Sequence, residues 1–138
     1  MNLEKAIQIA TNAHYGQRDK GGKPYILHCL RVMMQMDTEE EMIVAILHDI
    51  IEDTNYTLLQ LQKDGFSLVV HDSVKKLTKN RNEYYGKYIT KIKENQIAKK
   101  VKLADLKDNM DITRIYDPQP EDFARILKYA HAYSFLKK

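Results

Sequence analysis

The run Met42–Thr54 constrains this chain more than any other part of its sequence. An apolar segment at its start passes directly into one histidine and three acidic residues. These four polar residues are His48, Asp49, Glu52 and Asp53. Thr38 precedes the run with Glu41 three residues later, which is the spacing of a capping box. The pattern therefore predicts a helix from about residue 39 to residue 53 that carries the four polar side chains near its end.

The acidic end of this predicted helix needs either a compensating positive charge or full solvation. Neighbouring carboxylates repel one another, and the helix dipole disfavours negative charge at a C-terminus, each effect costing about 0.3–1 kcal/mol. Ile50 and Ile51 interrupt the acids, so the segment is not a plain polar tail. A histidine–aspartate pair on a buried helix is costly unless it is hydrogen-bonded or bound to metal. A solvated helix end and a bound cation both remain open at this point.

Length and composition favour one all-α domain. A chain of 138 residues, 43% of them hydrophobic, can bury a substantial core as a single domain. Only 5 glycines and 3 prolines supply turn signals, which suits a helical protein better than a sandwich or barrel. We predict one domain over residues 1–138, with a short helix or loop around residues 55–64. The main helices are predicted over residues 2–16, 24–35, 39–53, 66–78, 83–94, 97–112 and 119–136.

The same counts disfavour several classes of protein. Cys29 is the single cysteine, so no intrachain disulfide forms and a reducing compartment is expected. The N-terminus lacks the apolar core of a signal peptide and no run is long enough to span a membrane, so we expect a soluble, cytoplasmic protein. The net charge of +3 is compatible with an anionic small molecule but is too weak to indicate nucleic acid.

The segment Gln17–Tyr25 is predicted to be a basic loop. It combines Arg18 and Lys20 with paired glycines and a proline. Because glycine lets backbone N–H groups approach a ligand closely, such a loop is able to hold phosphate oxygens, although an ordinary basic surface loop has the same composition. His28 follows in the next predicted helix. A zinc site built on Cys29 is not expected, since the chain has no second thiol.

Asp105 lies where a helical pattern expects an apolar side chain. In the predicted helix over residues 97–112 it shares one face with mostly apolar residues. The other members of this face are Ala98, Val101, Asn109 and Ile112. A carboxylate on a core-facing stripe requires a partner, which is either a lysine or helix terminus, or a cation shared with the helix that ends at Asp53. One ion would satisfy both groups of acids.

Four motifs, taken in order, resemble a known family. They are Ala13-His14-Tyr15-Gly16-Gln17, Gly22-Lys23-Pro24-Tyr25-Ile26-Leu27-His28, Leu47-His48-Asp49-Ile50-Ile51-Glu52-Asp53-Thr54, and Val101-Lys102-Leu103-Ala104-Asp105 with Asn109. The histidines and aspartates in them look like the metal-binding set of the HD-domain phosphohydrolases. The wider motifs resemble the hydrolase domain of RelA/SpoT proteins. Those enzymes remove the 3′-pyrophosphate from guanosine tetraphosphate or pentaphosphate, the alarmones of the stringent response.

This resemblance implies a compact all-α HD domain and a role for individual residues. The implied ligands of a single Mn²⁺ ion are His28, His48, Asp49 and Asp105. Glu52 and Asp53 would lie beside the metal-activated water as catalytic carboxylates, and Asn109 would contact the nucleotide substrate. Arg18 and Lys20 of the basic loop are the other substrate-binding candidates. The mixed nitrogen and oxygen donors suit Mn²⁺ or Fe²⁺, and affinity alone also admits Zn²⁺.

Four positions depart from the family pattern near the expected guanine site. The alarmone hydrolases usually carry adjacent Arg-Lys in the loop, and they commonly read Leu-His-Asn-Met-Arg-Thr after the metal-binding aspartate. In this chain three acidic residues and one isoleucine stand at such positions, and these are Asp19, Asp108, Asp111 and Ile112. The sequence therefore supports phosphohydrolysis more strongly than it supports alarmone specificity.

Three functions are consistent with these residues. The first is a stand-alone, Mn²⁺-dependent alarmone pyrophosphohydrolase, because the length leaves no room for a synthetase domain. The second is an HD phosphohydrolase that acts on another nucleotide or phosphorylated metabolite, which Asp19 and Ile112 favour. The third is a non-catalytic helical module that binds a nucleotide, which the presence of Glu52 and Asp53 disfavours.

Overall fold

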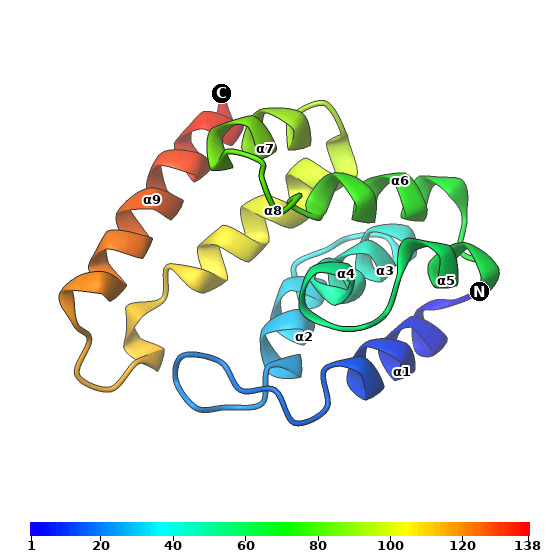
Figure 1. Ribbon diagram of the computed structural model, residues 1–138, viewed down its shortest axis with the longest axis horizontal. Coiled ribbons are helices and arrows are strands. Elements are labelled where there is room, and N and C mark those ends of the chain that lie inside the picture. The colour runs from blue at the N-terminus through cyan, green and yellow to red at the C-terminus, as the bar shows by residue number, and fades with distance from the viewer.

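The computed structural model describes residues 1–138 and confirms the all-α fold class (Figure 1). No helix combines the length and the apolar character needed to cross a membrane. In chain order the elements are α1 (Leu3–Ala13), α2 (Ile26–Met34), α3 (Glu39–Leu47), α4 (Ile50–Asp53), α5 (Leu58–Lys63), α6 (Leu68–Leu77), α7 (Tyr85–Ile92), α8 (Gln96–Asn109), the 3₁₀ helix η1 (Ile112–Arg114) and α9 (Pro120–Lys137).

Helix α3 lies at the centre of the fold, where it packs against α1, α2, α6 and α8. Residues 43–47 are all buried, as expected for a helix that is apolar on every side. The predicted capping box fixes its start. The Thr38 hydroxyl accepts a hydrogen bond from the Glu41 N–H at 3.1 Å, and the Glu41 carboxylate accepts one from the Thr38 N–H at 3.1 Å. The centre of the fold is therefore built from the sequence run that leads into His48.

The prediction of one continuous helix over residues 39–53 is wrong at one point. Helix α3 ends and α4 begins on either side of a tight turn at His48 and Asp49. The His48 N–H donates to the Ala45 carbonyl, three residues back, at 3.3 Å, and His48 Nδ1 donates to the same oxygen at 2.6 Å. Two donors on one carbonyl favour a turn tighter than an α-helix. Consecutive side chains on a regular α-helix do not face each other, whereas here His48 Nε2 lies 2.9 Å from Asp49 Oδ2.

The remaining predicted helices are present, with ends that differ by a few residues. The helix predicted over residues 2–16 ends at Ala13. The helix predicted over residues 97–112 ends at Asn109, after which the chain turns into η1. The segment predicted as a short helix or loop, residues 55–64, contains α5. These differences change the connections but leave the order of the main helices as predicted.

Helices α2 and α8, which are distant from each other in the sequence, converge beside the C-terminal end of α3. Helix α2 packs on both α3 and α8, and α3 also packs on α8. Helix α9, orange to red in Figure 1, lies along α8. The loop between α1 and α2 reaches the connection after α8, where Arg114 pairs with Asp19 at 3.3 Å. The turn after α3, the first half of α2 and the second half of α8 thus surround one point.

Candidate metal centre and substrate cleft

Four ionisable side chains meet at the point where these helices converge. In chain order they are His28 of α2, His48 and Asp49 of the turn after α3, and Asp105 of α8. Each offers one ligand atom, and these atoms all lie within 4.8 Å of one another. All are buried except Asp49, which is half-buried. We call these four residues the cluster. Their mixed nitrogen and oxygen donors are able to hold a divalent metal ion.

The two histidines present the same ring nitrogen to the carboxylates. His48 Nδ1 donates to a backbone carbonyl of α3, which leaves its Nε2 facing Asp49 Oδ2 at 2.9 Å and Asp105 Oδ1 at 3.2 Å. His28 Nδ1 lies 2.6 Å from Asp108 Oδ2, and its Nε2 lies 2.9 Å from Asp105 Oδ1. A hydrogen bond at one ring nitrogen fixes the tautomer and orients the other nitrogen for a metal. Both Nε2 atoms therefore face the position that an ion would take.

The charges of the cluster shift the pKa values of its members. Burial lowers the pKa of His48, but the charges of Asp49 and Asp105 outweigh it and hold this pKa well above its usual value. Burial also lowers the pKa of His28, while hydrogen bonds to Asp105 and Asp108 raise it, and the net shift is upward. Burial raises the pKa of Asp49, but the charge of His48 lowers it to about 2. The carboxylates of the cluster therefore favour the protonated form of both imidazoles.

Asp105 has the partners that a carboxylate on a core-facing stripe requires. Its Oδ2 accepts a hydrogen bond from Lys102 Nζ at 2.8 Å, and its Oδ1 accepts one from Asn109 Nδ2 at 3.1 Å. The Lys102 side chain is 12% exposed, and its ammonium lies 5.2 Å from the centroid of the Tyr88 ring. The lysine partner, one of the two predicted alternatives, is present, and Asp105 also lies in the cluster where the shared cation is predicted. The spacing of Lys102 three residues before Asp105 on one helix is the sequence signal for this pair.

The two carboxylates nominated for catalysis lie beside the cluster. Glu52 and Asp53 line a cavity of about 270 Å³ together with Asp49 and Asp105. The Glu52 carboxylate accepts a hydrogen bond from the Lys79 N–H at 2.8 Å, which holds it at the cavity wall. Burial, followed by the charges of Asp49 and Glu52, raises the pKa of Asp53 to about 6. Asp53 is thus close to the cluster and has the basicity of a proton acceptor near neutral pH.

Tyr25 makes a contact that the sequence reasoning missed. Its hydroxyl donates a hydrogen bond to Asp49 Oδ2 and so orients that carboxylate. Burial and the charge of Asp49 raise the pKa of Tyr25 well above its usual value, so the hydroxyl keeps its proton. Tyr25 lies one helical turn before His28 at the start of α2, and this spacing is the signal that links it to the cluster.

A second cavity, of about 290 Å³, adjoins the first. Its wall contains the three residues nominated for substrate binding, which are Arg18, Lys20 and Asn109. Arg114 and Arg125 add two cations that the sequence reasoning did not find, because they follow the last motif and no local pattern connects them to it. The two cavities share three lining residues, which are Tyr25, Asn109 and Tyr129. We call the joined cavities the cleft, which is acidic beside the cluster and basic at its other end.

The acidic departures from the family pattern have structural partners. Asp19 Oδ2 pairs with Arg114 at 3.3 Å, and its Oδ1 accepts a hydrogen bond from the Gly21 N–H at 2.9 Å. A side chain at Gly21 would collide with the carbonyl oxygen of Arg114, so the loop and this segment are held in close contact. Asp108 contacts one of the cluster histidines, and Asp111 caps the start of η1. Each of these acids therefore has a hydrogen-bond partner within the chain.

Comparison with known proteins agrees with this geometry. A solved structure described as a metazoan ortholog of SpoT that hydrolyses ppGpp matches with a TM-score of 0.79 over 97% of this chain and 84% of that chain, at 23% identity. The chain is 36% identical over 116 residues to the guanosine-3′,5′-bis(diphosphate) 3′-pyrophosphohydrolase of Haemophilus influenzae. It is 33% identical over 124 residues to the GTP pyrophosphokinase of Streptomyces coelicolor. This chain resembles the RelA/SpoT proteins.

The resemblance to RelA/SpoT proteins covers most of this chain but a small part of the longer relatives. The match covers 74% of this chain and 17% of the H. influenzae protein, and 81% of this chain and 15% of the S. coelicolor protein. No protein-family model matches the sequence. The two relatives carry different activities in their names, so the chemistry of the cleft has to indicate which activity this chain supports.

Loss of one cluster residue is expected to abolish metal binding. Asp49→Ala and His48→Ala each remove a donor and leave the remaining buried charges unpaired, which costs several kcal/mol before relaxation. Elemental analysis of the wild type loaded with Mn²⁺ should show a nearly stoichiometric ion, and both variants should show almost none. Asp37→Ala, at an exposed aspartate paired with Lys100, is the control and should retain the ion. Equal metal content in all four proteins would reject the site.

Metal affinity is expected to increase as the pH rises. Because the pKa values of His28 and His48 are raised, an ion must displace their protons, and below those pKa values each displaced proton changes the apparent dissociation constant about tenfold per pH unit. Calorimetric Mn²⁺ titrations at several pH values, in buffers of different ionisation enthalpy, measure both the affinity and the protons released. His71→Asn, outside the cluster, should leave the dependence unchanged. A constant affinity between about pH 6 and 8 would show that both imidazoles are already neutral.

Proposed function

We propose that this chain is an HD-domain phosphohydrolase, with residues 1–138 as one domain, that removes the 3′-pyrophosphate from guanosine tetraphosphate or pentaphosphate. The observation that carries the proposal is the cluster at the acidic end of the cleft, with two further carboxylates beside it and cations beyond it. A metal site, a carboxylate base and neighbouring cations each favour the cleavage of a phosphoryl bond. The hydrolase name of one relative and the ppGpp hydrolysis ascribed to the structurally similar SpoT ortholog agree with this reaction.

The proposed ligands of the ion are His28, His48, Asp49 and Asp105, and the proposed ion is Mn²⁺. Two imidazoles and two carboxylates suit Mn²⁺ or Fe²⁺, and Zn²⁺ also binds such sets. A divalent ion held there would polarise a phosphoryl oxygen and make a water more acidic. The chain itself supplies the orientation of the donors, since Tyr25 holds Asp49 and a backbone carbonyl holds His48.

Glu52 and Asp53 are the proposed catalytic carboxylates. Both line the cavity that contains the cluster, so they are able to orient the attacking water and accept its proton. The pKa of about 6 at Asp53 places proton transfer within reach of neutral pH. Lys102 and Lys79 line the same cavity, where their charges would offset the negative charge of the leaving pyrophosphate.

The basic end of the cleft is the proposed site of the rest of the nucleotide. Arg18, Lys20, Arg114 and Arg125 line this end. A substrate with phosphates on both sides of a nucleoside would place one phosphate group at the cluster and the other among these cations. Asn109 lies on the wall that the two cavities share, where its amide can hydrogen-bond to the sugar or base. The cleft therefore matches a nucleotide that carries charge at two ends.

A second candidate function is hydrolysis of another phosphorylated metabolite. Asp19 stands where the alarmone hydrolases usually carry arginine, and it is occupied by Arg114 and the Gly21 N–H. The residue at this position therefore offers no cation to stack on guanine. The candidate differs from the first in the substrate alone, because the cluster and the two catalytic carboxylates serve both.

A substrate panel is expected to show release of pyrophosphate from guanosine 3′,5′-bis(diphosphate) that depends on Mn²⁺. Guanosine 5′-diphosphate, which lacks the 3′ group, is the matched control and should yield nothing. The adenosine analogue measures how strongly the base is recognised. Faster turnover of the adenosine compound or of a non-nucleotide phosphate would select the second candidate function. No turnover of any compound by the metal-loaded chain would support a binding module instead.

Amide substitution at the catalytic carboxylates is expected to lower the rate without removing the metal. Glu52→Gln retains an acceptor for the Lys79 N–H, and Asp53→Asn retains its shape, so both should fold. Each should lower kcat by about 10²–10⁴, the usual contribution of a general base. Glu94→Gln, at a surface pair with Lys76, is the control and should be fully active. Full activity in both variants would remove these carboxylates from the mechanism, and loss of the metal would make them ligands.

A further inference from the structure

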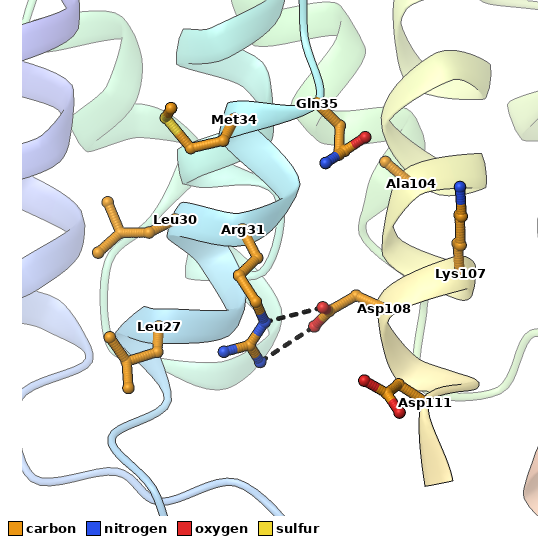
Figure 2. A pocket seen from close by; sticks show the side chains of 9 residues that line it. All are labelled: Leu27, Leu30, Arg31, Met34, Gln35, Ala104, Lys107, Asp108 and Asp111. Atoms are coloured by element: carbon orange, nitrogen blue, oxygen red, sulfur yellow. Dashed lines mark hydrogen bonds and ion pairs between the residues drawn. The ribbon is translucent and has the colours of Figure 1, made fainter. Parts of the chain in front are cut away.

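Asp108 lies between the cluster and an open groove of about 590 Å³ formed by α2 and α8. Figure 2 shows its carboxylate pointing from α8 toward α2, where Arg31 donates to both of its oxygens, at 2.8 and 3.2 Å. On the inner side, Asp108 Oδ2 lies 2.6 Å from His28 Nδ1. Arg114 approaches the same oxygen at 3.2 Å. Asp108 thus contacts two arginines and one imidazole, with Arg31 lining the groove.

The contact with Asp108 decides which nitrogen of His28 faces the cluster. A carboxylate accepts hydrogen bonds but does not donate them, so His28 Nδ1 must carry the proton. The lone pair of the neutral ring is then on Nε2, which lies 2.9 Å from Asp105 Oδ1. His48 is oriented in the same way by a neutral acceptor, the Ala45 carbonyl, at 2.6 Å. Of the two imidazoles, His28 alone is backed by a negative charge, and that charge makes its Nε2 the stronger donor to a metal.

We propose that Asp108 is a positioning residue that fixes the tautomer and orientation of His28 and strengthens it as a metal ligand, an inference that rests on the metal site proposed above. Asp108 stands at a position where the alarmone hydrolases commonly carry histidine, so this carboxylate is a feature of the present chain. Arg31 holds its plane through two hydrogen bonds, and Arg114 offsets its charge. The residues that hold His28 in place therefore include Asp108 and Arg31, both of which line the groove.

The same contacts also join α2 to α8, so a purely structural role has to be separated from the positioning role. Removing Arg31 breaks the ion pair between the helices but leaves the contact between Asp108 and His28, with Arg114 still beside it. Removing the charge of Asp108 weakens both contacts. Arg31→Met and Asp108→Asn therefore separate the two roles, because only the second changes the hydrogen bond at His28.

The test compares metal affinity and ring tautomer in four variants of the full chain. Asp108→Asn and Asp108→Ala should raise the dissociation constants of Mn²⁺ and Zn²⁺ by about 10–100-fold, the usual effect of losing the outer partner of a metal-bound histidine. Arg31→Met should lower Tm while leaving both constants within about threefold of the wild type. Asp72→Asn changes a surface histidine–aspartate pair and should alter neither Tm nor the two dissociation constants. In the Zn²⁺-loaded wild type, NMR of ¹⁵N-labelled histidines should show a proton on His28 Nδ1 that is protected from exchange, and this protection should be lost in Asp108→Ala.

Each outcome distinguishes the inference from the proposed function. Unchanged metal affinity in both Asp108 variants, with a wild type that binds metal, would overturn the inference alone. An Arg31→Met variant that loses as much affinity as Asp108→Asn would also overturn it, because the effect would then come from the joining of the helices. A wild type that binds neither metal would overturn the metal site and the inference together.

Discussion

The packing of two carboxylates against two imidazoles in a nearly buried space is the constraint on which the rest of this structure depends. An ionised carboxylate inside a protein costs several kcal/mol unless donors surround it. Asp105 receives four of them, from Lys102, Asn109 and both histidines. Each donor has to be delivered by a helix in a fixed register. The cluster therefore requires α2, the turn after α3, and α8 to be held rigidly, and the apolar helix α3 at the centre of the core does this.

The break after α3 is the local solution to this constraint. An uninterrupted helix would point His48 and Asp49 in different directions, and only one of them would reach the cluster. Two hydrogen bonds to the Ala45 carbonyl tighten the chain, so that His48 Nε2 and the Asp49 carboxylate face the same point. The interruption is confined to these two residues, since α3 ends at Leu47 and α4 begins at Ile50. The same arrangement raises the pKa values of both imidazoles, because each faces ionised carboxylates.

Patterns within one helix were readable from the sequence, and contacts between distant segments were not. The capping box at Thr38 and the polar side chain of Asp105 on an apolar stripe are local features, and the structure contains both. The break at His48 depends on how its ring meets a carbonyl in the folded chain, which no spacing encodes. Arg125 reaches the cleft because α9 lies along α8, and that packing joins segments whose sequences show no common pattern. The motifs thus named the four residues that meet in the cluster, but only half of the cations in the basic wall.

Two of the acidic departures from the family pattern share one partner. Asp19 and Asp108 are far apart in the sequence, yet Arg114 contacts both of them, at 3.3 and 3.2 Å. Its guanidinium also donates to the Asp108 carbonyl at 2.6 Å, so one cation joins the loop between α1 and α2 to helix α8. Asp108 also has Arg31 and His28 as partners, whereas Arg114 is the one cationic side chain paired with Asp19. Arg114 therefore offsets part of the negative charge of the two aspartates and joins the basic end of the cleft to Asp108, which contacts His28.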